Sequence, residues 1–113
     1  MKKGFTLIEL LVVIAIIGIL IAVGSISYAR AVQLSRDSRR KTDLEQLRQA
    51  LETYRSENAS YPATGALASL APDFITTIPS DPKTGTAGYV YTYTRNTATT
   101  YSLCAELANF TTD

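Results

Sequence analysis

Histidine and tryptophan are absent from this chain of 113 residues, and cysteine occurs once, at Cys104. Without histidine there is no His-based catalytic triad. With a single cysteine there is neither an internal disulfide nor a zinc site built from Cys and His. The sequence also holds no carboxylate cluster and no nucleophile paired with a general base. We therefore predict a protein that is not an enzyme and that uses no cofactor and no metal.

Charge is missing from residues 10–29. These 20 apolar residues would make roughly 30 Å of helix, which is enough to cross a bilayer. A cleaved secretory signal is the alternative, with Gly24-Ser25-Ile26-Ser27 as a weak cleavage site. Because such a signal has a shorter apolar core, we favour a retained membrane helix.

The charged residues are unevenly distributed after this run. Residues 30–41 carry a net charge of +4, whereas residues 42–113 carry −4. We call the basic residues beside the apolar run the basic collar: Arg30, Arg36, Arg39, Arg40 and Lys41. The collar is expected to be a solvated anchor that contacts the membrane before assembly, and nucleic acid is not expected as a partner.

Glu9 lies immediately before the apolar run. An ionised side chain at the centre of a membrane costs about 2.5 to 3.5 kcal/mol and usually marks a function with a specific partner. A shallow position among the lipid headgroups is the alternative. Residue chemistry alone supports both interpretations equally.

The string Lys2-Lys3-Gly4-Phe5-Thr6-Leu7-Ile8-Glu9-Leu10 and the apolar run after it resemble the class III signal of type IV prepilins and of type II secretion pseudopilins. The resemblance implies that a prepilin peptidase cuts between Gly4 and Phe5, which makes residues 1–4 a leader peptide. It also implies that Phe5 becomes the N-methylated first residue. Glu9 then takes the family's glutamate position, which acts in assembly.

A single long helix is expected from Phe5 to about Glu57, because neither proline nor glycine interrupts residues 25–57. Its length would be about 80 Å, which is typical of a membrane or assembly helix. Ile26 departs from the family, in which many members carry a helix-kinking proline. An apolar stripe follows on one face of the helix: Leu44, Leu47, Leu51 and Tyr54.

The remaining residues are rich in Thr, Pro and Gly. We expect a loop over 58–87, with a short helical turn within 66–71 and turn chemistry over 78–85. Alternation with period two predicts an antiparallel hairpin over 88–107, with strands at 89–94 and 101–107 and its turn across 95–100. One face of this hairpin should cover the apolar stripe of the helix, which we call the leucine stripe.

Two features of the hairpin permit more than one interpretation. Its tyrosine row could stack single-stranded nucleic acid or conduct charge, but we interpret it as strand-forming structure. The row comprises Tyr89, Tyr91, Tyr93 and Tyr101. Cys104 is interpreted as a small, buried or half-buried apolar residue.

These features predict an α+β protein, with a helix that spans the membrane over residues 5–29 and a small hairpin head within residues 30–113, a pilin-like lollipop. The resemblance implies a structural subunit of a type IV pilus-like or type II secretion pseudopilus filament. Its partners would be identical subunits, prepilin peptidase and an inner-membrane assembly platform. The alternative is a single-pass, membrane-anchored binding protein that does not polymerise.

The resemblance also implies a location. The head would lie outside the cytoplasmic membrane, and after assembly the subunit would belong to a cell-surface or periplasmic filament. The basic collar favours the opposite orientation under the positive-inside rule. We follow the resemblance, because Lys2 and Lys3 must face a peptidase on the cytoplasmic side. Pilin and pseudopilin branches both stay open.

Overall fold

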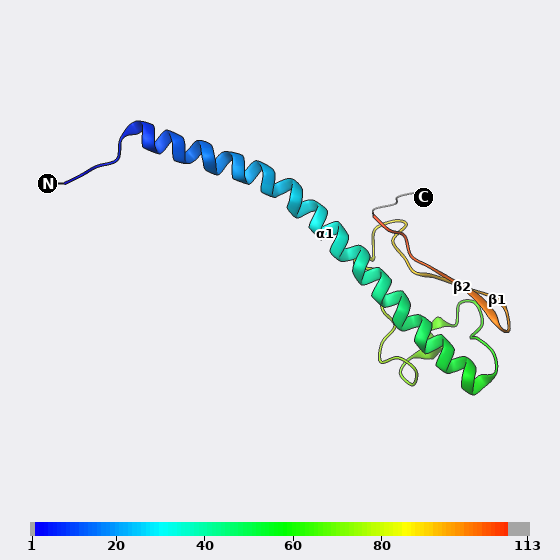
Figure 1. Cartoon of the computed structure of the whole chain (residues 1–113). Coiled ribbons are helices and arrows are strands. Elements are labelled where there is room, and N and C mark those ends of the chain that lie inside the picture. Colours follow the sequence, from blue (N-terminus) through cyan, green and yellow to red (C-terminus); the bar gives the residue numbers. More distant parts are fainter. Residues whose placement is uncertain (1, 109–113) are drawn as a thin grey trace. The chain divides into compact units, whose positions relative to one another are not determined.

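The computed structural model describes residues 2–108. In chain order its elements are helix α1 (Leu7–Asn58), the short 3₁₀ helix η1 (Leu67–Leu70) and strands β1 (Thr92–Thr97) and β2 (Thr100–Cys104) (Figure 1). The chain divides into two compact units, one ending at Gln33 and the other beginning at Leu34. The predicted α+β class, with a long amino-terminal helix and a small antiparallel hairpin, is confirmed.

The first unit consists of the amino-terminal part of α1 and the residues before it. An 18-residue window of α1 has a mean hydropathy of 3.0, and the helix is long and apolar enough to cross a membrane. None of that window is buried inside the protein. Such a continuous apolar surface requires lipid or other protein chains around it.

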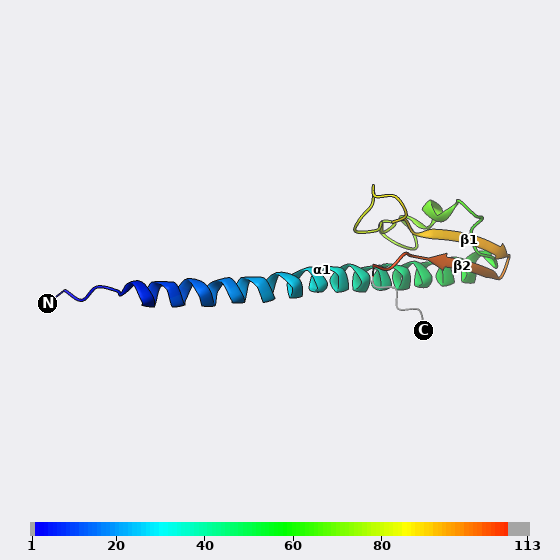
Figure 2. The same cartoon turned by 90° about the horizontal axis from the view of Figure 1, so that it is seen from above.

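The second unit has its core between α1 and the segments that follow it. Leu47 and Leu51 of the predicted stripe are fully buried, together with Leu70 of η1. Tyr93 of β1 is 8% exposed and completes the core. Tyr91, Tyr101 and Leu103 also pack against it, so the expectation that the hairpin covers the leucine stripe is confirmed (Figure 2).

The hairpin differs in position from the prediction. β1 begins at Thr92 and continues to Thr97, and β2 ends at Cys104. The predicted turn across 95–100 is too long, because Arg95, Thr97 and Thr100 pair in the ladder, with one irregularity between Arg95 and Thr97, and the turn between the strands is at residues 98–99. Residues 105–108 leave the ladder, and there the Ala108 N–H donates to Asp37 Oδ1 of α1 at 3.0 Å.

Cys104 is exposed, so its interpretation as a buried or half-buried residue is wrong. Along β2 the side chains of Tyr101 and Leu103 are half-buried, whereas those of Ser102 and Cys104 are exposed. This follows from the strand period of two residues, because the apolar side chains of Tyr101 and Leu103 occupy the inner face.

α1 ends at Asn58, close to the predicted end, because Ala59 adopts a left-handed φ of 59°. The Ala59 N–H donates to the Arg55 carbonyl at 2.8 Å. The Asn58 side-chain amide donates to the Tyr54 carbonyl at 3.0 Å. The first bond satisfies the Arg55 carbonyl, which has no partner within the helix, and the second adds a side-chain donor to the last turn.

We expect Ala59→Gly to stabilise the head by about 0.5 to 1 kcal/mol, because glycine occupies the left-handed region without steric cost. The measurement is thermal unfolding of the full chain in detergent, followed by the near-ultraviolet circular dichroism of its tyrosines. Ala63→Gly is the matched control, because Ala63 is exposed and has no positive φ. Equal shifts in both variants would contradict the prediction.

Candidate functional site

Glu9 is held at the start of α1 by reciprocal hydrogen bonds with Thr6. The Thr6 backbone N–H donates to Glu9 Oε2 at 2.8 Å, and the Thr6 hydroxyl donates to the same oxygen at 3.0 Å. In return, the Glu9 N–H donates to Thr6 Oγ1 at 3.3 Å. This is a capping box, with Thr6 at the N-cap and Glu9 at the third helical position. It explains why α1 begins at Leu7 rather than at the predicted Phe5.

Sequence reasoning did not identify Thr6 as a partner of Glu9. The Thr-x-x-Glu spacing is itself the signature of a capping box, so the sequence contained the signal. Within residues 2–108, none of the ion pairs includes Glu9. The described donors to this carboxylate are therefore both groups of Thr6, and both are neutral.

The predicted cleavage junction lies just before the helix. Phe5 is 95% exposed, and both Gly4 and Phe5 precede the first helical residue. A Cβ added at Gly4 would have no heavy atom within 4 Å. The fold of the chain thus does not require glycine at position 4. If glycine is needed there, the reason is another molecule that approaches this backbone closely.

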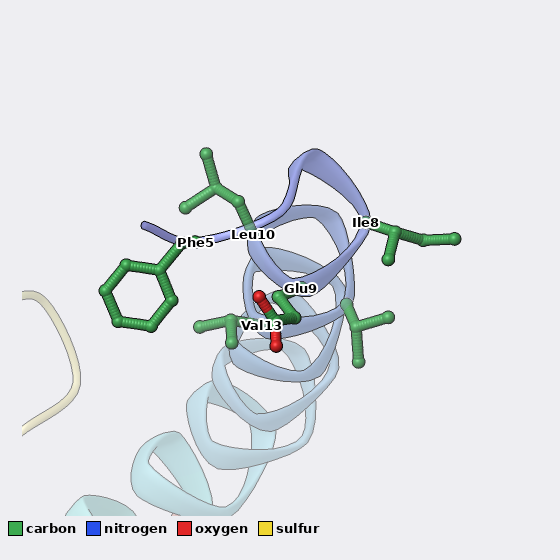
Figure 3. Close-up of a pocket in the computed structure, with 6 residues that line it drawn as sticks. Phe5, Ile8, Glu9, Leu10 and Val13 are labelled. Atoms are coloured by element: carbon green, nitrogen blue, oxygen red, sulfur yellow. The ribbon is translucent and has the colours of Figure 1, made fainter. Parts of the chain in front are cut away.

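Phe5 and Glu9 lie together at one open groove. The groove has a volume of about 590 Å³ and is otherwise lined by Ile8, Leu10, Val12 and Val13. Figure 3 shows the carboxylate among the labelled apolar side chains around the first turns of α1. Glu9 is the one ionisable side chain in this lining, so a charged group placed in the groove would interact with Glu9.

The head contains a second polar cluster, which sequence reasoning did not find. Arg40 Nε donates to Asp81 Oδ2 at 2.6 Å, and Arg40 Nη2 donates to Asp81 Oδ1 at 3.1 Å. Arg40 Nη1 donates to Asp37 Oδ1 at 2.7 Å, and the Tyr89 ring lies 5.0 Å from the guanidinium carbon. The side chains of Arg40 and Asp81 are fully buried. We call this cluster the arginine clamp, because it ties the loop around Asp81 to α1.

The arginine clamp corrects the description of the basic collar. Arg40 is 0% exposed, so the expectation of a solvated charge is wrong at this position. Its neighbour Arg39 keeps 65% of its side chain exposed, with Nε 4.0 Å from Asp43 Oδ2. Sequence reasoning missed the clamp because Asp81 has the chemistry of an ordinary turn residue and Arg40 lies 41 positions earlier.

The tyrosine row is part of the packed head. Tyr93 Oη donates to the Pro62 carbonyl and Tyr91 Oη donates to Asp43 Oδ2, each at 2.6 Å. The ring centroids of Tyr61 and Tyr101 are 4.6 Å apart. Burial and the Asp43 contact raise the pKa of Tyr91. The interpretation as strand-forming residues holds for Tyr93 in β1 and Tyr101 in β2. Tyr89 and Tyr91 precede β1, and the Tyr89 ring lies beside Arg40.

The arginine clamp should make the head sensitive to acid. Its hydrogen bonds from Arg40 hold the pKa of Asp81 below the ordinary value. A lowered carboxyl pKa stabilises the fold above the unfolded-state pKa, about 3.9 for aspartate, and this stabilisation is lost as the pH falls through the folded-state pKa. We expect the thermal midpoint of the head to change little between about pH 5 and 7 and to fall below about pH 4.

The measurement is the same tyrosine circular dichroism, recorded across the pH series. Glu45→Gln serves as the surface control, because Glu45 pairs with Arg48 at 2.6 Å while both side chains remain about half exposed. Its acid profile should match that of the unmodified chain. A midpoint that stays constant well below pH 4 would show that the clamp does not couple folding to this carboxylate.

Two family profiles match successive parts of the chain. The Prokaryotic N-terminal methylation motif matches residues 1–25. The family described as "Type IV minor pilin ComP, DNA uptake sequence receptor" matches residues 27–113. The first match includes the capping box and the Gly4–Phe5 junction, and the second includes the whole head.

Several characterised proteins are similar to part of this chain. The Type IV major fimbrial protein FimA of Dichelobacter nodosus is 47% identical over 53 residues, which are 47% of this chain and 34% of FimA. The Type IV major pilin protein PilA of Myxococcus xanthus (strain DK1622) is 42% identical over 60 residues, 53% of this chain and 27% of PilA. Fimbrial protein EcpC of Eikenella corrodens is 41% identical over 70 residues, 62% of this chain and 46% of EcpC. These matches span less than half of each relative's length, and no solved structure matches.

Proposed function

The chain belongs to the type IV minor pilin ComP family, and we propose that it is a pilus subunit that is cut by prepilin peptidase and polymerises through its amino-terminal helix. A type IV pilus-like filament and a type II secretion pseudopilus are both compatible with this proposal. In either filament, identical copies would surround the apolar part of α1 in place of lipid. The single-pass binding protein that never polymerises is the competing function.

The observation that supports this proposal best is the arrangement around Glu9. A junction outside the helix, at Gly4 and Phe5, is followed by a capped helix start and by an apolar segment that is not buried inside the protein. Cutting at this junction would create an ammonium group at Phe5, in the groove that Phe5 and Glu9 share. A buried charge pair of this kind fixes register more than it adds stability.

The proposed subunit would start as a single-pass protein of the cytoplasmic membrane, with its head outside. It would then be extracted by an inner-membrane assembly platform into a cell-surface or periplasmic filament. The positive-inside rule favoured a cytoplasmic head because the basic collar is positively charged. Arg40 of the collar is buried and paired with carboxylates, so this argument is weaker. Protease access to tags at each end of the chain in intact cells tests this orientation.

The family description includes a receptor for DNA, but we do not propose nucleic acid as a partner of this chain. Residues 34–108 contain eight basic and eight acidic residues. Arg40 and Arg48 bond directly to carboxylates, and Arg39 lies within 4.0 Å of one. Affinity for DNA rests mainly on basic side chains that neutralise phosphates, and a balanced head provides no such excess.

The proposal predicts that Gly4→Leu abolishes processing, because the peptidase must approach an extended backbone that has no Cβ. Intact-mass analysis of membranes and sheared filaments should find precursor that retains residues 1–4 and almost no chain that begins at N-methylated Phe5. Gly18→Leu is the matched control, because a Cβ at Gly18 likewise meets nothing within 4 Å. It should be cut normally.

The unmodified chain provides the decisive outcome. A surface form that retains Met1 to Gly4 would exclude the processing step. A correctly cut chain that stays in the membrane, with no filament in sheared fractions when the complete assembly machinery is present, would favour the membrane-anchored binding protein.

A further inference from the structure

A groove on the head lies between α1 and the segment after η1. Its α1 side is formed by residues on one helix face, Gln46, Gln49, Ala50 and Thr53. Its other side is formed by the consecutive residues Phe74, Ile75, Thr76 and Thr77. The volume is about 450 Å³, and the Phe74 ring contacts Tyr54 of α1 edge to face at 5.2 Å. We call this site the amide groove.

The lining of the amide groove has no charged side chain. The chain has a contrasting groove along the opposite border of α1, where Lys41, Glu45 and Arg48 line the surface beside Tyr101. A phosphate, carboxylate or ammonium ligand entering the amide groove would lose hydration without gaining a counter-charge. The lining therefore selects for a ligand that is polar and neutral.

The polar groups of the amide groove are available to such a ligand. Within residues 2–108, the side chains of Gln46, Thr76 and Thr77 make no hydrogen bond to protein. Gln49 uses its Nε2 in a 3.4 Å contact to Glu45, which leaves its Oε1 as an acceptor. Amides and hydroxyls both donate and accept hydrogen bonds, which is the capacity that a ligand hydroxyl also has.

The floor of the groove is apolar and held in place. Ala50 is 3% exposed, and Phe74 and Ile75 are half-buried against the core. A sugar ring has the matching surface, because its C–H faces are apolar and its edge carries hydroxyls. We propose that the amide groove binds a neutral saccharide, with the ring over Phe74 and Ile75 and its hydroxyls on Gln46, Gln49 and Thr76. The volume lies in the lower part of the range for small-ligand sites, roughly 300 to 1,000 Å³, and suits a short saccharide.

The first test uses the three glutamines of the chain as internal reporters. Gln46 and Gln49 line the groove, whereas Gln33 lies outside it. The full chain, labelled with ¹⁵N, is placed in phosphocholine micelles, because maltoside and glucoside detergents would occupy the site. Glucose, galactose, N-acetylglucosamine and their disaccharides are then added. We expect the side-chain amide signals of Gln46 and Gln49 to shift with saturation, and that of Gln33 to stay unchanged.

The second test asks whether the named side chains cause the binding. Gln46→Leu with Thr76→Val keeps the shape of the lining and removes two polar groups, so affinity should fall at least tenfold. Thr86→Val with Thr94→Val is the matched control, because both threonines are exposed and lie outside the groove, and it should leave affinity unchanged. Glucuronate, a charged analogue of glucose, should bind at least tenfold more weakly than glucose.

Three results would overturn the proposal. One is the absence of saturable shifts at Gln46 and Gln49 with every neutral sugar. Another is an equal shift of the side-chain amide signal of Gln33. The third is an affinity for sugar that is unchanged in the Gln46→Leu, Thr76→Val variant. This inference does not depend on polymerisation, so sugar binding by a chain that forms no filament would leave it intact.

Discussion

Glu9→Ala should be cut between Gly4 and Phe5 and inserted into the membrane normally, yet it should reduce the yield of filaments roughly tenfold or more. In the part of the single chain that the structure describes, Glu9 is bonded to Thr6 and forms no ion pair. In a filament, the Phe5 ammonium of a neighbouring copy could meet this carboxylate and set the axial stagger between subunits. Without the carboxylate, apolar helices can still associate, but no charge pair selects their register. Gel mobility measures processing, and shearing measures filament yield.

Two further substitutions at Glu9 separate its charge from its capping role. Glu9→Gln preserves an acceptor for Thr6, since glutamine also serves in the capping box, but it removes the charge. We expect Glu9→Gln to fail in assembly nearly as completely as Glu9→Ala, whereas Glu9→Asp should retain part of the filament yield. A normal filament yield from Glu9→Gln would show that Glu9 acts in assembly by capping the helix and not through its charge. Normal yield from Glu9→Ala would mean that Glu9 rests among the headgroups without a function in register.

Arg40→Met should destabilise the head by about 3 to 5 kcal/mol, because it leaves the buried carboxylate of Asp81 without the guanidinium that donates to it. The Asp81 side chain is 0% exposed and accepts two hydrogen bonds from Arg40. Domains of this size have total stabilities of about 5 to 15 kcal/mol, so a large fraction of the free energy of unfolding would be lost. Thermal unfolding of the full chain in detergent, followed by tyrosine circular dichroism, gives the difference.

The adjacent arginine supplies the matched control for the arginine clamp. Arg39→Met removes the same chemical group from a side chain that is 65% exposed, and it should cost less than about 1 kcal/mol. Adding Asp81→Asn and Asp37→Asn to Arg40→Met should recover part of the stability, because fewer charges are then buried without a partner. Equal effects of Arg40→Met and Arg39→Met would show that the clamp contributes little to folding.

The helix and the hairpin illustrate which parts of this fold can be predicted from sequence. The helix depends on neighbours three and four positions apart, so its pattern predicted the end of α1 to within one residue. The hairpin depends on which residues pair across two strands and on contacts outside the sheet. The hydrogen bonds from Arg95 N–H to Thr64 Oγ1 and from Tyr61 N–H to the Ala98 carbonyl tie the turn end of the hairpin to the loop after α1. Alternation within the strands does not encode these contacts, and the predicted strands were therefore displaced.

The candidate site could be predicted from local sequence, whereas the arginine clamp could not. The sequence by itself determined the apolar segment, the position of Glu9 just ahead of that segment and the apolar stripe, because each follows from adjacent residues or from the helical period. Only the tertiary structure decided that Arg40 is a buried partner of Asp81 rather than a surface cation, that Cys104 faces outward, and that Gln46 and Thr76 line one groove. The physical reason is distance along the chain. Burial and long-range pairing depend on how segments that are tens of residues apart pack together, and no local pattern specifies that arrangement.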